Sequence, residues 1–253
     1  MNNKIDRTPV FYTSEQMDKI TDYIREKYGN TEGYTAHEIQ SAYVHTDTLI
    51  LDPEGQARRF VTFGMGARAM NSPSNFVRTE LVMSASPKIG AGKKESFAIA
   101  GELVRVSKFP FRENVWVGPG HTMDTSKEFE KMFGYDYVAF CDTTNSVCLP
   151  EIDEAIHFLA LVPIYKEERE WCVENSTFAL LDKLYEKYGE NIFNVDFKRD
   201  ILLPQLTEKE LEDYKIMNVL GICKETYERL CAYIDQCDEV TYEKIEKWIT
   251  ENR

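Results

Sequence analysis

The stretch from Ile156 to Val162 constrains the fold of this chain more than any other segment. It reads IHFLALV and is almost continuously apolar. A strand with one face in water alternates apolar and polar residues, whereas a strand covered on both faces has no reason to do so. We therefore expect 156–162 to be a central strand of a sheet that is covered on both sides.

Other segments supply the remaining elements of this sheet and its covering helices. Strand-like patterns mark 44–51, 59–64, 76–84, 115–117 and 137–141. Helical periodicity marks 13–28, 95–107 and 177–188. Thr13 and Gln16 fit a capping box before the first helix, and Pro110 is expected to prevent the second helix from continuing. Because strands and helices interleave irregularly, the sequence predicts an α+β fold with a mixed, largely antiparallel sheet and packed helices.

The character of the chain changes after Leu203 and Pro204. The segment 205–253 shows no strand pattern and is acidic, while 206–220, 224–233 and 241–249 each follow the helical period. We therefore divide the chain into a main domain, 1–204, and an acidic helical C-terminal extension, 205–253.

Charge and composition narrow the choice of partners and compartment. The formal charge is −13, from 43 acidic and 30 basic residues. Such a surface repels phosphate backbones and anionic lipids, so nucleic acids and membranes are poor partners, whereas a basic protein or peptide suits it. The sequence shows neither a secretory signal nor a membrane span, and its six cysteines form no CxxC pair. We expect a reduced, cytoplasmic protein.

No motif predicts a reaction, a cofactor or a metal. No serine lies in a G-x-S-x-G context, and the Gly-rich stretch before Lys93 fails the Walker spacing. His45 and Asp47 share one face of a predicted strand, but no third and fourth ligands accompany them. His121 is the one histidine with a functional setting, because it follows a sharp turn at 118–120. It either performs chemistry or braces that turn.

Four motifs follow one another between residues 40 and 200. They are FVTFGM at 60–65, ELVM at 80–83, FPFRENVWVGPGH at 109–121 and IHFLALVPIYKEE at 156–168. In this order they resemble the suppressor-of-fused family, and the length of the chain resembles the compact bacterial members. The resemblance covers about two thirds of the chain. No counterpart can be placed for 205–253.

The resemblance implies a protein-binding module rather than an enzyme. Bacterial members are commonly grouped with immunity proteins that neutralise toxins, and eukaryotic members clamp a short peptide as an added strand. Eukaryotic members tend to place an acidic residue immediately before the histidine, where this chain has Gly120. The peptide contact made by that acidic residue therefore cannot be transferred to this chain.

These considerations give a set of candidate partner-binding residues. The set is Phe109, Trp116, Gly120, His121, Glu167 and Glu168. Aromatic side chains would anchor the partner, and the carboxylates would match a basic surface, as on a toxin. Core packing is the alternative for Phe109 and Trp116, and a solvated face is the alternative for Glu167 and Glu168. Competing functions are a hydrolase-like enzyme centred on His121 and a scaffold that self-associates through its C-terminal helices.

Overall fold

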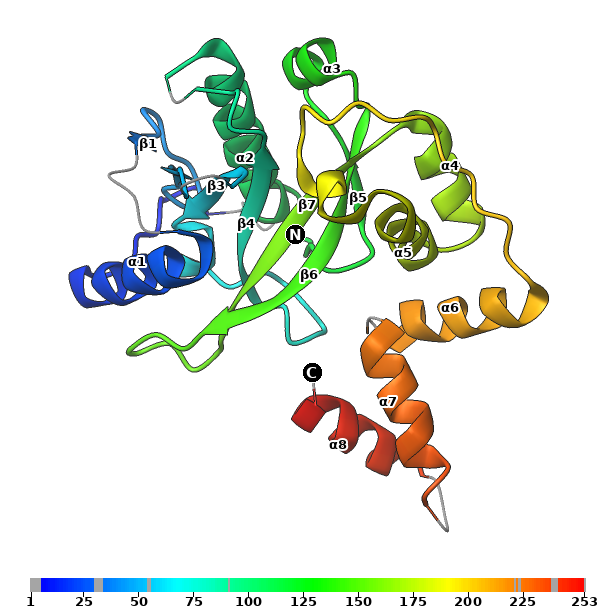
Figure 1. The fold of residues 1–253 in the computed structure, drawn as a ribbon. Coiled ribbons are helices and arrows are strands. Elements are labelled where there is room, and N and C mark those ends of the chain that lie inside the picture. The colour runs from blue at the N-terminus through cyan, green and yellow to red at the C-terminus, as the bar shows by residue number, and fades with distance from the viewer. Residues whose placement is uncertain are drawn as a thin grey trace, which may run out of the picture.

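A mixed β-sheet forms the centre of the structure, a computed structural model that describes residues 6–29, 34–53, 56–90, 92–220, 222, 224–237 and 241–252 (Figure 1). Within these residues the sheet has seven strands in the order β1-β2-β3-β4-β7-β6-β5. They are β1 (Tyr34–Ala36), β2 (Asp47–Leu51), β3 (Arg58–Phe63), β4 (Arg78–Ala85), β5 (Thr122–Asp124), β6 (Tyr137–Val147) and β7 (Ile156–Ile164). Only the β4–β7 pair is parallel among them. The predicted α+β class and largely antiparallel sheet are confirmed.

The apolar run predicted as a central strand is β7. It lies between β4 and β6, and all of its residues except His157 are buried. Leu159 and Leu161 face the side of the sheet that α2 (Lys94–Glu113) covers, whereas Val162 packs on the side of α5 (Thr177–Tyr188). Both faces of β7 are therefore covered, which is why its sequence does not alternate.

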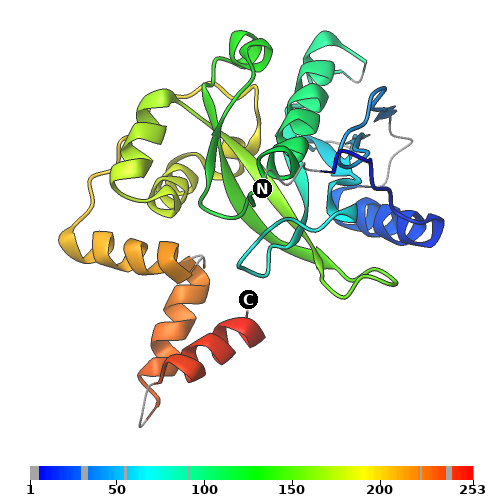
Figure 2. The same ribbon diagram turned by 180° about the vertical axis from the view of Figure 1, so that it is seen from behind.

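Helices form a layer on each side of the sheet (Figures 1 and 2). On one face lie α2 (Lys94–Glu113) and α3 (Lys127–Phe133). On the other lie α1 (Ser14–Tyr28), α4 (Lys166–Glu174) and α5 (Thr177–Tyr188), with the short 3₁₀ helices η1 (Met65–Ala67) and η2 (Gly189–Phe193) in connections. The capping box of Thr13 and Gln16 is confirmed, with both of its hydrogen bonds present.

Two predictions about the segment after α2 are wrong. The helix does not stop at Pro110 but continues to Glu113, and Asn114 ends it in the left-handed conformation at φ 55°. Pro110 begins the last turn of the helix, so its missing N–H removes only one hydrogen bond from the helix. The stretch 115–117 is an irregular connection rather than a strand.

A buried carboxylate ties the N-terminal segment to the sheet. Glu80 on β4 is fully buried and accepts hydrogen bonds from the hydroxyls of Tyr12 (2.7 Å) and Thr62 (2.5 Å). It also accepts from the backbone N–H groups of Gly64 (2.9 Å) and Gly66 (3.0 Å). Burial raises the pKa of Glu80, and the four donors oppose that effect. The group is therefore satisfied within the core.

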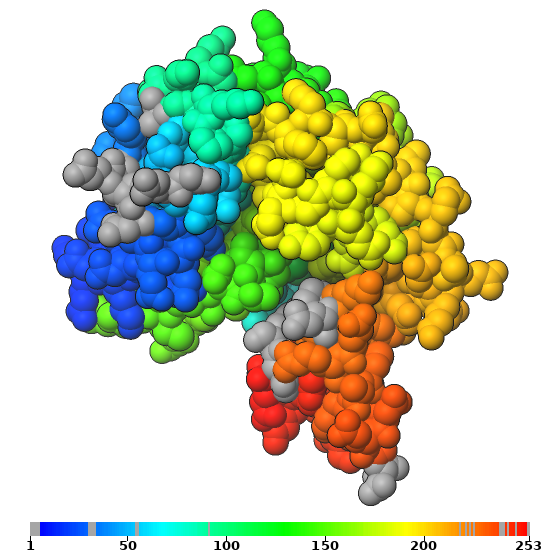
Figure 3. Space-filling model, in the orientation of Figure 1, coloured from blue at the N-terminus to red at the C-terminus, as the bar shows by residue number. Residues whose placement is uncertain are grey.

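The C-terminal helices α6 (Glu208–Leu220), α7 (Lys224–Ile234) and α8 (Tyr242–Asn252) protrude from the main body (Figure 3). They attach through α5, where Phe178 and Ala179 are buried against Tyr214 and Met217 of α6. The Tyr214 hydroxyl also donates to Asp182, at 3.0 Å. All three predicted helices are confirmed, while the division of the chain at residue 204 stays a prediction. None of the described helices has the length and apolar character needed to cross a bilayer.

Candidate functional site

Two glycines shape the loop between α2 and β5. A Cβ on Gly118 would lie 2.4 Å from Cζ3 of Trp116, and one on Gly120 would lie 3.0 Å from Cε2 of Phe178. Gly120 also has a φ of 83°, which side chains other than glycine rarely adopt. The loop closes with the His121 N–H donating to the Gly118 carbonyl, at 3.2 Å. These glycines let the indole fold back over the loop and let α5 approach it.

The His121 ring lies against the Trp116 ring, with centroids 4.4 Å apart and planes at 60°. Burial lowers the pKa of His121, so the imidazole is neutral at neutral pH. Among the described residues, no carboxylate forms a hydrogen bond or ion pair with it. Nucleophilic or acid–base catalysis by histidine normally uses such an orienting partner. His121 is therefore held against the Trp116 ring, without an acidic partner among the described residues.

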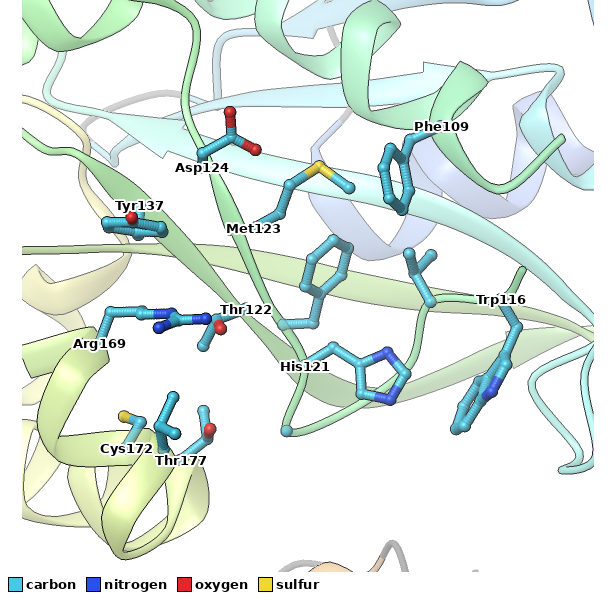
Figure 4. A pocket seen from close by; sticks show the side chains of 14 residues that line it. Phe109, Trp116, His121, Thr122, Met123, Asp124, Tyr137, Arg169, Cys172 and Thr177 are labelled. Carbon is cyan, nitrogen blue, oxygen red and sulfur yellow. The ribbon is translucent and has the colours of Figure 1, made fainter. Parts of the chain in front are cut away.

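The same loop forms one side of a pocket of about 750 Å³ (Figure 4). Its lining residues are Phe109, Trp116, Val117, Gly120, His121, Thr122, Met123, Asp124, Tyr137, Phe140, Arg169, Cys172, Val173 and Thr177. Four of the six candidate residues from the sequence, Phe109, Trp116, Gly120 and His121, are therefore brought together. Glu167 and Glu168 are not among the lining residues.

The pocket lies at the outer edge of the sheet, which β5 forms. The Phe140 N–H of β6 donates to the His121 carbonyl at 2.9 Å, and Thr122 stands opposite Ala139. In an antiparallel pair of strands, only every second residue forms backbone hydrogen bonds with the partner strand. Because His121 is bonded to β6, the N–H and C=O groups of Thr122 and Asp124 point away from β6. The Asp124 carbonyl accepts from the Arg105 guanidinium, as this geometry requires. Among the described residues, no strand pairs with this outer side of Thr122, so its backbone faces the open edge of the sheet.

The pocket has two chemically different sides (Figure 4). On the α2 side, Phe109, Trp116 and His121 present aromatic rings. On the α4–α5 side, the Arg169 guanidinium lies over the Tyr137 ring, 5.6 Å from its centroid, beside Cys172, Thr177 and Thr122. Burial raises the pKa of the Cys172 thiol to about 12, so it is not a nucleophile at neutral pH.

The two glutamates predicted at the interface have different positions. Glu168 is fully buried and pairs with the Arg199 guanidinium, whose Nη2 lies 2.8 Å from Oε2. It also accepts from the backbone N–H groups of Tyr165 (3.0 Å) and Leu202 (2.9 Å). Glu168 thus fastens the chain around residue 200 to α4 and has no surface to offer a partner. Glu167 is exposed in the first turn of α4.

Helix α4 contributes three lining residues that sequence reasoning missed, namely Arg169, Cys172 and Val173. From the sequence, only Glu167 and Glu168 of this segment are considered, as partner contacts or a solvated face, although Glu168 and Cys172, which are both buried, are spaced by four, as on one face of a helix. That spacing was the available signal. It is easy to miss, because a glutamate, which is usually an exposed residue, occupies one of the two buried positions.

The sequence predicts no metal site at His45 and Asp47, because no third and fourth ligands accompany them. Nε2 of His45 lies 3.1 Å from Oδ1 of Asp47, and Nδ1 of His37 lies 2.9 Å from Oδ2 of the same carboxylate. Within the described ranges, no three His, Cys, Asp or Glu side chains form a group that could hold an ion. His37 is a hydrogen-bonding partner of this aspartate, whereas His45 lies within ion-pair distance of it and has its hydrogen bond with Ser41.

Comparison with known proteins identifies the family. The family model described as Suppressor of fused protein (SUFU) matches residues 42–199. A structure described as the Sufu-Fu complex has a TM-score of 0.58 at 11% identity, covering 79% of this chain and 100% of that chain. A putative SUFU homologue from Neisseria gonorrhoeae FA 1090 has a TM-score of 0.55 at 12% identity, covering 77% and 100%. No curated protein matches the sequence. Because the family model spans more than half of its length, the chain belongs to the suppressor of fused protein family.

Proposed function

We propose that the chain is a non-catalytic protein-binding module that binds its partner at the open edge of β5. One observation carries the proposal: the outward backbone of Thr122 lies beside a pocket of about 750 Å³ that Phe109 and Trp116 also line. An extended segment of a partner can add to such an edge through main-chain hydrogen bonds, while the pocket accepts its side chains. Membership of the suppressor of fused family supports the same function.

The chemistry of the aromatic side suits anchoring rather than catalysis. Trp116 and His121 pack against each other, and Trp116 and Phe109 are only partly buried against the core, so parts of both rings remain accessible. Large aromatic side chains carry much of the energy of protein interfaces. The hydrolase alternative requires an activated His121, and the described residues give it no acidic partner.

We further propose that the partner is a toxin with a basic surface and that the chain acts as an immunity protein in the bacterial cytoplasm. The formal charge of −13 supports this choice, because a strongly acidic surface attracts a basic protein from a distance and speeds association. The fold is shared with a putative family member from N. gonorrhoeae over the whole of that chain, which supports a bacterial setting. Glu167 is exposed on α4, which supports a contact with such a basic surface.

A comparative pull-down tests this function. Tagged wild type, Trp116→Ala and Phe97→Ala are used to capture proteins from the native lysate, and mass spectrometry identifies what each retains. Phe97 is the matched control, because it is a 59% exposed aromatic residue on α2 outside the pocket. We expect one partner to be retained by wild type and Phe97→Ala and lost by Trp116→Ala. Equal retention by all three proteins would place the interface elsewhere.

Coexpression tests the immunity role separately. The captured partner is expressed alone and together with each variant, and cell growth is measured. Growth arrest by the partner alone, relieved by wild type and Phe97→Ala but not by Trp116→Ala, is the expected result. A partner that leaves growth unchanged contradicts the immunity role while leaving the binding function intact.

A further inference from the structure

The pocket contains a positive charge that no carboxylate neutralises. Among the described residues, the side chain of Arg169 forms no hydrogen bond and no ion pair, and its Nε is buried without a partner. Its terminal nitrogens are directed past Tyr137 toward Thr122, into the pocket (Figure 4). A guanidinium left without an acceptor in a partly desolvated position is unfavourable. A ligand that supplies an acceptor removes that penalty.

Neighbouring charges show why Arg169 is unpaired. The nearby buried carboxylate of Glu168 already pairs with Arg199 and accepts hydrogen bonds from two backbone N–H groups. Arg169 instead lies over the Tyr137 ring, with its Cζ 5.6 Å from the ring centroid, a cation–π contact that restrains the guanidinium. The guanidinium is thereby restrained where it lines the pocket. Less conformational entropy is lost when a planar anion binds to such a group.

We propose that Arg169 receives an acidic side chain, Asp or Glu, of the segment that binds along β5. The inference rests on the proposed function, which supplies a protein segment at this edge. A guanidinium fork matches a carboxylate with two parallel hydrogen bonds. Arg169 is the only Lys or Arg among the described residues that line the pocket, and Asp124 lines it too. Phosphate groups are usually bound by clusters of cations, so this single cation beside a carboxylate favours a singly charged acceptor.

The position of β5 predicts what accompanies the acidic residue. Successive side chains of an extended segment point to opposite faces of a sheet. Arg169, Cys172 and Thr177 lie on the α4–α5 side, whereas Phe109 and Trp116 lie on the α2 side (Figure 4). A segment that directs its acidic side chain to Arg169 therefore directs the flanking residues to the aromatic rings. The expected pattern is apolar, acidic, apolar.

Peptide display tests this specificity with the full chain. A library of short random peptides on phage is selected against wild type, Arg169→Gln, Arg169→Glu and Lys166→Gln. Lys166 is the matched control, because it is an exposed cation on the same helix that does not line the pocket. We expect wild type and Lys166→Gln to enrich an acidic residue flanked by apolar ones, Arg169→Gln to lose the acidic preference, and Arg169→Glu to select Lys or Arg instead.

The reversed preference cannot result from a folding defect, because a misfolded protein gains no new specificity. For a selected peptide, replacing its acidic residue by the amide should weaken binding to wild type about 10- to 100-fold and change binding to Arg169→Gln little. Peptides that bind at the pocket without acidic enrichment would overturn the role of Arg169 and leave the proposed function standing. Failure of every protein to select any peptide would overturn both.

Discussion

Removing the buried carboxylate of Glu168 should destabilise the fold strongly. In Glu168→Ala, Arg199 keeps a side chain that is 1% exposed but loses its ion-pair partner. The Pro163 carbonyl at 3.0 Å from Nη2 remains as an acceptor but carries no full charge. Breaking a buried pair by removing one partner costs about 3–5 kcal/mol. At about 2–4 °C per kcal/mol for a chain of this size, Tm should fall by roughly 10 °C.

Urea and thermal unfolding, followed by circular dichroism, measure this effect. Glu167→Ala is the control, because Glu167 is the exposed neighbour on the same helix and its loss should change the free energy of unfolding by less than about 0.5 kcal/mol. The double variant Glu168→Ala with Arg199→Met removes the unpaired cation, so it should be more stable than Glu168→Ala alone. A Glu168→Ala variant as stable as wild type that has lost its partner would refute the structural role and place Glu168 in the interface.

Three further changes test other parts of the structure. Gly118→Ala should displace the Trp116 indole, because the new Cβ would lie 2.4 Å from it. We expect reduced capture of the partner and an altered tryptophan fluorescence spectrum. An unchanged spectrum would contradict the displacement. Tyr12→Phe removes one donor from the buried carboxylate on β4 and should lower the free energy of unfolding by about 1–3 kcal/mol in urea titration. In mildly alkaline buffer a thiol reagent should label exposed Cys148 first and buried Cys172, whose pKa burial raises to about 12, only after unfolding; equal rates contradict this burial.

Local patterns were enough to predict much of the fold. The apolar run of β7, the capping box of α1 and the periodicity of α5 each depend on residues close in sequence. The errors also have local causes. The sequence predicts that Pro110 stops the helix, although the last turn of α2 loses only one hydrogen bond to this residue. It also predicts a strand at 115–117, but these residues lie in a loop that the glycines at 118 and 120 fold back.

The candidate site depended on contacts that sequence does not reveal. Phe109, Trp116 and His121 were grouped because they share one motif, and the structure places all three at one pocket. The pairing of Glu168 with Arg199 joins residues 31 positions apart, so no local pattern shows which glutamate is buried. The same pairing leaves Arg169 without a carboxylate, which is why the positive charge in the pocket of an acidic protein was not expected.

Site-directed photocrosslinking at the pocket tests most directly whether a partner binds at the β5 edge. A photoreactive phenylalanine analogue is placed at Val173, which lines the pocket and is 65% exposed, and in a second protein at Phe97, which is exposed outside it. Both are irradiated in the native lysate, and mass spectrometry maps the attached peptides. We predict that position 173 crosslinks to one partner segment with an acidic residue and that position 97 does not. Crosslinking of the captured partner at position 97 alone would contradict binding at this edge.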